Sequence, residues 1–412
     1  MTSARPALAV AVHDGFYGWG TGAGRSNRAF LHILCDLLAP RVRLTVLPIR
    51  LDPGSAEYDP DWHRESVALI EGAGDVIPVD NGTAGRTRFG GLANFRQASA
   101  SAAAEITVIL GSTPRALAVA FDAPFFGIAS ALPAPHAART VNVARATAML
   151  HAPDDHERIE WERHGLLATA RAGGRIAATS RHIRQHLTGS YAIPSPAITD
   201  LINGLTPGET RPRPAADGTS LLPPQARRRF MLSYGRAGPY KGFDDLIDAI
   251  AILRAAGTPV PHLVLGAVTD GPTPTPYQRH LAQRITGEDL SVTLRTSFSP
   301  GFRSLLAHPA LAAVIVPSRA EPFGRIPLEA YAAGASPVIA TTAGGLAEIV
   351  TESRTGYTAA PADPRSLARA ISRALAASPA QRRRLLDAGW QLTRDRFDYQ
   401  ANVTAFLNAV AP

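Results

Sequence analysis

One stretch in the last third of the chain most constrains the fold, because it reads as a strand, a loop, a helix and a second strand. An apolar run at 312–316 precedes the loop, and another at 337–340 follows the helix. Apolar runs this short are typical of parallel strands buried on both faces. Pro327 is tolerated only in a first helical turn, so we expect the helix to begin near Ile326. The stretch therefore predicts part of a parallel α/β sheet.

The same alternation of short strands and helices runs through both halves of the chain. Strands are expected at 7–12, 44–47, 76–78, 106–110, 144–150, 176–180, 230–235, 262–266 and 292–294. Such alternation is typical of doubly wound parallel sheets, and 412 residues are too many for one ordinary core. We therefore expect an α/β protein with two Rossmann-like domains facing a cleft.

The composition changes near the middle of the chain. Residues 206–224 hold five prolines and show no apolar periodicity, which is typical of a linker. The predicted organisation is therefore an N-terminal domain at 1–205, a linker at 206–228 and a C-terminal domain at 229–395. For the last helix, at 396–412, packing back onto the N-terminal domain is one alternative.

A net charge of +8 and a pI near 10.1 raise the alternative of a basic protein that binds nucleic acid or a membrane surface. The arginines are scattered, however, without aromatic-basic alternation. We find no apolar run long enough to span a membrane and no signal-peptide core. The single Cys35 agrees with a reducing compartment. We therefore expect a cytoplasmic protein without a nucleic-acid partner or stable membrane insertion.

Charged residues follow the strand expected at 230–235. Arg236 offers a guanidinium fork and Lys241 a compact ammonium for phosphate oxygens. Lys241 is the single lysine in a chain that otherwise uses arginine. Its retention suggests that a larger guanidinium does not fit there, although chance retention is the alternative.

Two glutamates flank the helix start of the opening stretch. Glu321 falls in the loop above the sheet and Glu329 in the first helical turn, beside the backbone N–H groups of Gly324 and Arg325. Helix N-termini bind anions, and ligands of open parallel sheets bind beyond the strand ends. A sugar nucleotide, with both hydroxyls and an anionic group, suits this arrangement.

The N-terminal half carries weaker signals in the loop after residues 7–12. Gly22 and Gly24 suit a close backbone approach to a phosphate, with a plain flexible loop as the alternative. The neighbouring rings suggest an acceptor stacked on aromatic faces; they are Phe16, Tyr17 and Trp19.

His151 is expected at the end of the strand at 144–150, where such sheets bind ligands, with a structural histidine as the alternative. The pairs His13-Asp14 and Asp155-His156 lack a third spaced ligand, so we expect no metal.

The C-terminal motifs together closely resemble the retaining GT-B glycosyltransferases of family 4, the glycosyl transferases group 1. They are Gly235-Arg236-x4-Lys241-Gly242, Glu321-x7-Glu329 and Gly344-Gly-Leu-Ala-Glu-Ile349. The resemblance covers nearly the whole chain, although the N-terminal motifs are divergent. It implies a nucleoside-diphosphate sugar as donor, a metal-independent reaction and no cofactor.

The resemblance also implies roles for individual residues. Glu321 would lie near the donor sugar's hydroxyls and Glu329 would accept hydrogen bonds from the ribose. Other donor contacts would come from the amides of Phe323, Gly324 and Arg325, from His151 on the N-terminal side, and from the loop with Gly22 and Gly24. Arg236 and Lys241 would neutralise the leaving diphosphate. We count His151, Arg236, Lys241 and Glu321 as catalytic.

We therefore expect a retaining transfer of a sugar to a small soluble acceptor, of the kind used in antibiotic and other secondary-metabolite biosynthesis. Our hypothesis is a front-face reaction, in which the departing phosphate oxygen takes the acceptor's proton. The alternative within the same fold is a sugar-nucleotide epimerase or a phosphorylase.

Overall fold

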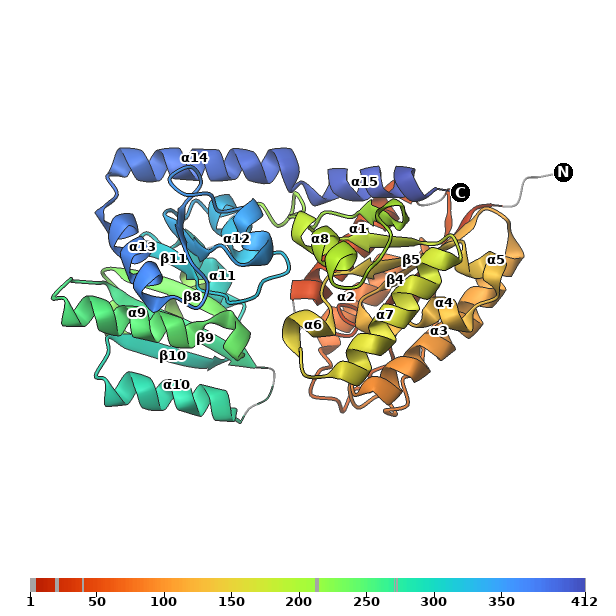
Figure 1. Ribbon diagram of the computed structural model, residues 1–412, viewed down its shortest axis with the longest axis horizontal. Coiled ribbons are helices and arrows are strands. Elements are labelled where there is room, and N and C mark those ends of the chain that lie inside the picture. The colour runs from red at the N-terminus through yellow and green to blue at the C-terminus, as the bar shows by residue number, and fades with distance from the viewer. Residues whose placement is uncertain are drawn as a thin grey trace. The chain divides into compact units, whose positions relative to one another are not determined.

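The computed structural model describes residues 5–18, 22–38, 41–211, 215–269, 271 and 273–411. The chain divides into two compact units, one formed by Met1–Asn203 with Gln400–Pro412 and the other by Gly204–Tyr399. Each unit contains one parallel sheet with helices packed against it (Figure 1). The predicted class, two doubly wound α/β domains, is confirmed.

The described residues of the N-terminal unit form a seven-stranded sheet in the order β3-β2-β1-β4-β5-β6-β7. Its strands are β1 (Ala7–Val12), β2 (Arg43–Pro48), β3 (Gly74–Val76), β4 (Ala116–Phe121), β5 (Thr140–Ala144), β6 (Arg175–Ala178) and β7 (Ile198–Asp200). Its longer helices are α1 (Gly22–Leu38), α2 (Pro60–Ile70), α3 (Leu92–Ser112), α7 (His156–Arg171) and α8 (Arg181–Gly189). Strand β1 pairs with β2 on one side and β4 on the other. The strand order therefore reverses between β1 and β4, where sheets of this kind bind ligands.

The described residues of the C-terminal unit form a six-stranded sheet in the order β10-β9-β8-β11-β12-β13. Its strands are β8 (Phe230–Arg236), β9 (His262–Thr269), β10 (Val292–Ser297), β11 (Leu311–Val316), β12 (Val338–Thr341) and β13 (Tyr357–Ala359). Its helices include α9 (Phe243–Ala255), α10 (Pro276–Gly287), α11 (Gly301–Ser304), α12 (Arg325–Ala332), α13 (Pro364–Ala376) and α14 (Pro379–Arg396). Here the order reverses between β8 and β11, so the loops after these two strands lie side by side.

Two strand predictions in the N-terminal half are wrong. Residues 106–110 belong to helix α3, where Ile106 and Leu110 are buried at helical spacing and Val108 between them is 72% exposed. The expected strand at 144–150 ends at Ala144 and is followed by the short helix α6 (Ala148–His151). Strand β4, which no prediction contained, lies at the centre of the sheet and has a buried core of alanines.

The residues predicted as a linker, 206–228, include the 3₁₀ helices η3 (Ala215–Leu221) and η4 (Pro224–Ala226). The guanidinium of Arg295 donates to the carbonyl of Leu221 at 2.9 Å, so this segment is attached to the C-terminal sheet. At the other end of the chain, α15 (Tyr399–Val410) carries Phe406, whose ring lies 6.3 Å from that of Phe30 on α1.

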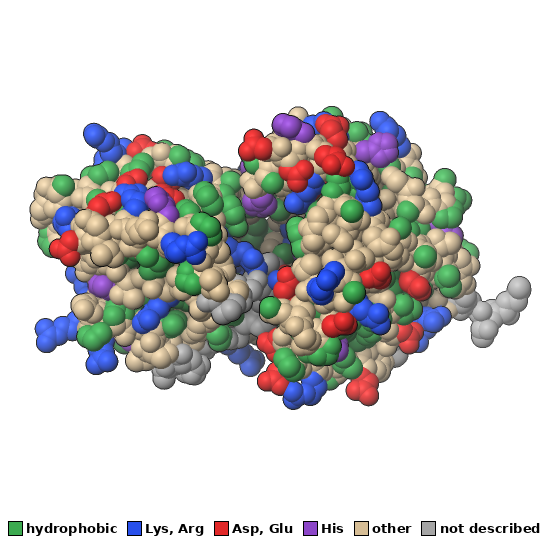
Figure 2. All heavy atoms as spheres, turned by 90° about the horizontal axis from the view of Figure 1, so that it is seen from below, with side chains coloured by type: hydrophobic (Ala, Val, Ile, Leu, Met, Phe, Trp, Pro, Cys, Tyr) green, Lys and Arg blue, Asp and Glu red, His purple; other side chains and the backbone are tan. Residues whose placement is uncertain are grey.

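The surface shows no dominant basic face in the view of Figure 2, where arginines and acidic side chains are interspersed. Within the ranges that the structure describes, no helix is both long and apolar enough to cross a bilayer.

Candidate active site

Two loops at the carboxyl edge of the C-terminal sheet, those after β8 and β11, are joined by backbone hydrogen bonds. The backbone N–H groups of Arg319 and Ala320 donate to the carbonyl of Tyr240 at 2.8 and 3.2 Å. Gly242 has φ of +66°, and a Cβ there would lie 2.0 Å from the carbonyl oxygen of Pro317. Glycine is therefore required at this crossing, since it alone allows both the left-handed backbone and the close approach.

The loops bring Lys241 and Glu321 into direct contact. The Lys241 Nζ lies 2.5 Å from Glu321 Oε2, which also accepts from the Ser318 hydroxyl at 3.2 Å. Burial works to lower the pKa of Lys241, but the Glu321 carboxylate and Tyr240 together outweigh it, so this pKa is raised. The ammonium therefore stays charged and in a fixed place. Arg236, at the end of β8, adds a second positive charge close enough to act on Lys241.

An ion pair that the sequence did not reveal supports these loops. The guanidinium of Arg319 donates two hydrogen bonds to the Asp245 carboxylate, both at 2.7 Å. Asp245 is buried in the first turn of α9, so the loop that holds Glu321 is tied to the helix that follows Lys241. A fork paired with a carboxylate fixes distance and direction together.

The start of α12 lies at the same edge of the sheet. Gly324 has φ of +93° and immediately precedes α12. This left-handed residue turns the chain, so that Phe323, Gly324 and Arg325 lie at the N-terminus of the helix. The N–H of Gly345 donates to the carbonyl of Glu321 at 2.8 Å and fixes the far side of the loop. Helix N-termini favour anions. The side chain of Phe323 is buried with its edge toward Phe397.

Glu329 is 5% exposed and lies one turn into α12. The Tyr234 hydroxyl donates to its Oε2 at 3.2 Å, and the Arg325 Nε lies 3.5 Å from its Oε1. The ring of Tyr234 stacks on Phe302, with 9° between the ring planes. Of the predicted C-terminal residues, Lys241 and Glu321 are thus in direct contact, and Arg325 and Glu329 form a neighbouring pair.

A second polar group, which the sequence reasoning missed, lies at the reversal between β1 and β4. His13 follows β1 and Asp122 follows β4, with His13 Nδ1 3.5 Å from Asp122 Oδ2. Arg145, the first residue after β5, donates from Nε to Asn27 Oδ1 at 3.1 Å and lies 3.8 Å from Asp122. Burial lowers the pKa of His13 to about 4 and raises that of Asp122. His13 is therefore neutral at pH 7.

Asp122 has φ of +72° and ψ of 178°, a conformation that is unusual for any residue with a side chain. Such strain persists only where the surroundings enforce it, and it is frequent at functional positions. Three neighbouring strand ends supply His13, Asp122 and Arg145, so only the sheet order brings these residues together.

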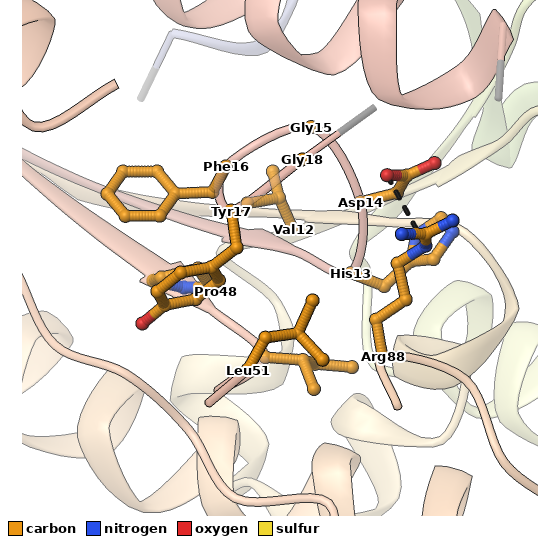
Figure 3. Close-up of a pocket in the computed structure, with 11 residues that line it drawn as sticks. Val12, His13, Asp14, Gly15, Phe16, Tyr17, Gly18, Pro48, Leu51 and Arg88 are labelled. Atoms are coloured by element: carbon orange, nitrogen blue, oxygen red, sulfur yellow. Dashed lines mark ion pairs between the residues drawn. The ribbon is translucent and has the colours of Figure 1, made fainter. Parts of the chain in front are cut away.

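A narrow recess lies beside this group (Figure 3). Arg88 and Asp14 face each other on one side of it, 3.4 Å apart, and Phe16 and Tyr17 lie on the other. Leu51 also lines the recess. It therefore has a charged side and an apolar side.

The glycine-rich loop packs closely against Asp14. A Cβ on Gly24 would lie 2.6 Å from Cγ of Asp14, so Gly24 makes room for that buried carboxylate. Gly22 is the exposed first residue of α1. Trp19 and Gly20 lie outside the described residues. Phe16 and Tyr17 are 2% and 8% exposed, so in this structure their faces are covered rather than open to an acceptor.

His151 does not directly follow a strand, and that expectation is wrong. It is the exposed last residue of α6, and Arg145 occupies the strand end instead. The helix is anchored by Glu162, which accepts from the Ala148 N–H at 2.8 Å and the Tyr191 hydroxyl at 2.7 Å. Among the described residues, no three His, Cys, Asp or Glu side chains gather to form a metal site.

Comparison with known proteins agrees with the C-terminal geometry. Residues 222–389 match the family model described as glycosyl transferases group 1. The matched range contains Arg236, Lys241, Glu321 and Glu329, so the loops described above lie within the part of the chain that is similar to this family.

Curated relatives match parts of the chain. A glycogen synthase of Mycobacterium tuberculosis is 45% identical over 24% of this chain and 23% of its own length. A D-inositol 3-phosphate glycosyltransferase of Frankia alni is 33% identical over 49% of this chain and 50% of its own. The aligned parts thus span about a quarter to a half of these relatives.

Solved structures match the whole fold. Sucrose-phosphate synthase from Thermosynechococcus elongatus superposes with a TM-score of 0.76 over 98% of both chains at 20% identity. Anabaena Alr3699/HepE, in complex with UDP and glucose, has a TM-score of 0.71 at 19% identity over 98% of this chain and 99% of its own. These likenesses confirm the predicted GT-B type of fold.

Proposed function

We propose that this protein is a retaining glycosyltransferase that moves a sugar from a nucleoside diphosphate to a small soluble acceptor. The observation that carries the proposal is the Lys241–Glu321 pair beside the N-terminus of α12, with Glu329 one turn further on. One charged ammonium, one helix N-terminus and two carboxylates match the diphosphate, sugar and ribose of such a donor. The HepE complexes with UDP-glucose and with UDP support this class of donor.

In this proposal the residues of the C-terminal unit have separate tasks. Glu321 contacts donor sugar hydroxyls, Glu329 contacts the ribose, and the amides of Phe323, Gly324 and Arg325 hold the sugar and the diphosphate. Arg236 and Lys241 neutralise the diphosphate as the glycosidic bond breaks. Because this charge develops only as the bond breaks, such contacts lower the barrier rather than merely tighten binding.

The mechanism that we propose is a front-face transfer. The bond between the anomeric carbon and the departing phosphate oxygen breaks, the acceptor oxygen bonds to the same face, and its proton passes to the phosphate oxygen. No metal or other cofactor takes part. His151 meets the donor sugar, and Gly22 and Gly24 belong to the loop that approaches it.

The acceptor is proposed to bind in the N-terminal unit, at the recess beside His13 and Asp122. A relative named as a D-inositol 3-phosphate glycosyltransferase supports a small hydroxylated acceptor. Secondary-metabolite biosynthesis, such as that of an antibiotic, is the pathway class that we propose. The unpaired Cys35 supports a cytoplasmic location.

A panel of UDP-, GDP-, ADP- and TDP-sugars tests the donor class by thermal shift, since a ligand that binds only the folded protein raises its melting temperature. We expect one nucleotide series to raise it, and the rise to be lost in Lys241→Met. Absence of a shift with every donor would contradict the proposal. An inverted product from an α-linked donor would refute retention. Release of free nucleotide only when an acceptor is added would separate a transferase from an epimerase or a phosphorylase.

A further inference from the structure

The sequence predicts a role only for the backbone amide of Arg325, but its side chain also makes several contacts. It is 9% exposed, its Nη1 donates to the carbonyl of Gly204 at 2.8 Å, and its Nη2 pairs with the Glu209 carboxylate. Its Nε faces Glu329 at 3.5 Å. Burial works to lower the pKa of Arg325, but Glu209, Glu329 and Tyr399 together outweigh it and raise this pKa. One fixed guanidinium therefore links three acceptor groups.

The partner carboxylate of Glu209 is itself held in place. Its Oε2 accepts from the backbone N–H of Thr206 at 3.0 Å and from the Thr206 hydroxyl at 3.3 Å, which leaves Oε1 to face Arg325. Thr206 and Glu209 lie just after Gly204, where the chain enters the C-terminal unit. Arg325 thus sits between the entering segment and the helix that carries Glu329.

The opposite side of Glu329 is fixed by Tyr234, whose ring is stacked on Phe302. With Oε1 facing Arg325 and Oε2 accepting from Tyr234, the plane of the carboxylate is set by two independent neighbours. A carboxylate that must meet two adjacent hydroxyls needs this orientation, because hydrogen bonds weaken steeply when their angles are poor.

We infer that Arg325 is a positioning residue, which holds Glu329 in the orientation that selects a ribose diol, and that Glu209 holds Arg325. The inference rests on the proposed function and adds to it a specificity role for a side chain and for a residue outside the predicted motifs. It assigns ribose discrimination to a chain of contacts, Glu209 to Arg325 to Glu329, rather than to Glu329 alone.

The test compares ligands that differ only at the ribose. Isothermal titration measures the affinities for UDP and 2′-deoxyuridine diphosphate, with the matching ADP and GDP pairs in parallel and inorganic pyrophosphate as the ribose-free probe. The variants are Arg325→Lys, Arg325→Met, Glu209→Gln and Glu329→Gln. Arg284→Met is the control, because Arg284 also bridges two carboxylates of this unit, those of Asp248 and Glu288.

We expect the unaltered protein and Arg284→Met to prefer the ribonucleotide by about tenfold or more, the size of one hydrogen bond to a charged group. Arg325→Met and Glu329→Gln should bring this ratio close to one, while the affinity for pyrophosphate changes less than threefold. Glu209→Gln, which leaves both Arg325 and Glu329 in place, should reduce the ratio in part. Arg325→Lys should also recover only part of it, because an ammonium cannot contact all three groups.

Removal of Arg325 leaves the buried carboxylate of Glu329 and the partly buried one of Glu209 without their cation, so Arg325→Met can fail to fold. In that case the affinity ratios of Glu209→Gln and Arg325→Lys test the inference, and thermal melting checks that each variant is folded. A ratio equal to that of the unaltered protein in both folded variants overturns the role of Arg325 while the proposed function stands. Failure of the unaltered protein to bind any of the nucleoside diphosphates contradicts the proposed function and this inference together.

Discussion

Gly345→Ala tests whether the loop at 317–324, which carries Glu321, is held as closely as the structure indicates. A Cβ at this position would lie 2.6 Å from Cα of Phe323 and 2.7 Å from the carbonyl oxygens of Pro322 and Phe323. All three are backbone atoms, which cannot turn aside as a side chain can. Carbon contacts are favourable near about 3.5 Å, so the loop must move by roughly 1 Å.

Two effects follow from that shift. Overpacking of a buried site costs about 1–3 kcal/mol, which lowers the melting temperature of a unit the size of Gly204–Tyr399 by about 2–12 °C. A displacement of roughly 1 Å in a positioning loop also lowers turnover by up to about a hundredfold. The shift would also disturb the hydrogen bond from the Gly345 N–H to the Glu321 carbonyl.

The assay is calorimetric melting together with titration of the nucleoside diphosphate that binds most tightly. Gly287→Ala is the matched control, because no atom lies within 4 Å of a Cβ at the end of α10. The control should melt at the same temperature as the unaltered protein or slightly above it. If Gly345→Ala also melts unchanged and binds the nucleotide with unchanged affinity, the close packing of Gly345 against the loop at 317–324 is refuted.

Three other predictions concern both units. Lys241→Met should weaken binding of a nucleoside diphosphate by about ten- to a hundredfold, but that of the nucleoside far less, by titration; equal losses for both would contradict contact with the phosphates. His186 is buried against Thr147 at 2.8 Å, and burial lowers its pKa from 6.5 to about 4. The unfolded chain therefore binds more protons between these values, and the free energy of unfolding should fall by at most about 3 kcal/mol as the pH drops from 6.5 to 4. His186→Gln should flatten this slope in urea titrations. Gly24→Ala should destabilise the protein by about 1–3 kcal/mol through its clash with Asp14, and a double-mutant cycle with Asp14→Ala should show strong coupling.

The C-terminal site was largely predictable because its signals are local. Lys241 and Glu321 each follow a strand by a few residues, and the two strands are neighbours in the sheet. Their positions at the ends of predicted parallel strands are therefore enough to place both residues at the same edge of the sheet. The glycines at 242 and 324 mark positive φ in the same loops.

The N-terminal site was not predictable for the opposite reason. Arg145 and Asn27 are 118 residues apart and meet only because β1, β4 and β5 are adjacent. The β-branched run within 106–110 favours a strand by propensity, but packing of Ile106 and Leu110 against the core places it in helix α3. The true strand, β4, is rich in alanine, which favours helices.

The chain enters and leaves the C-terminal unit at neighbouring residues. Leu205 and Asp398 form a β-bridge, and the N–H of Tyr399 donates to the carbonyl of Leu205 at 3.0 Å. The C-terminal unit is thus an insertion within the N-terminal one, since residues after 399 belong again to the first unit. Replacement of residues 204–399 by the corresponding unit of a protein with the same fold therefore needs only two joins, a few ångströms apart, and leaves the sheet of the N-terminal unit uninterrupted.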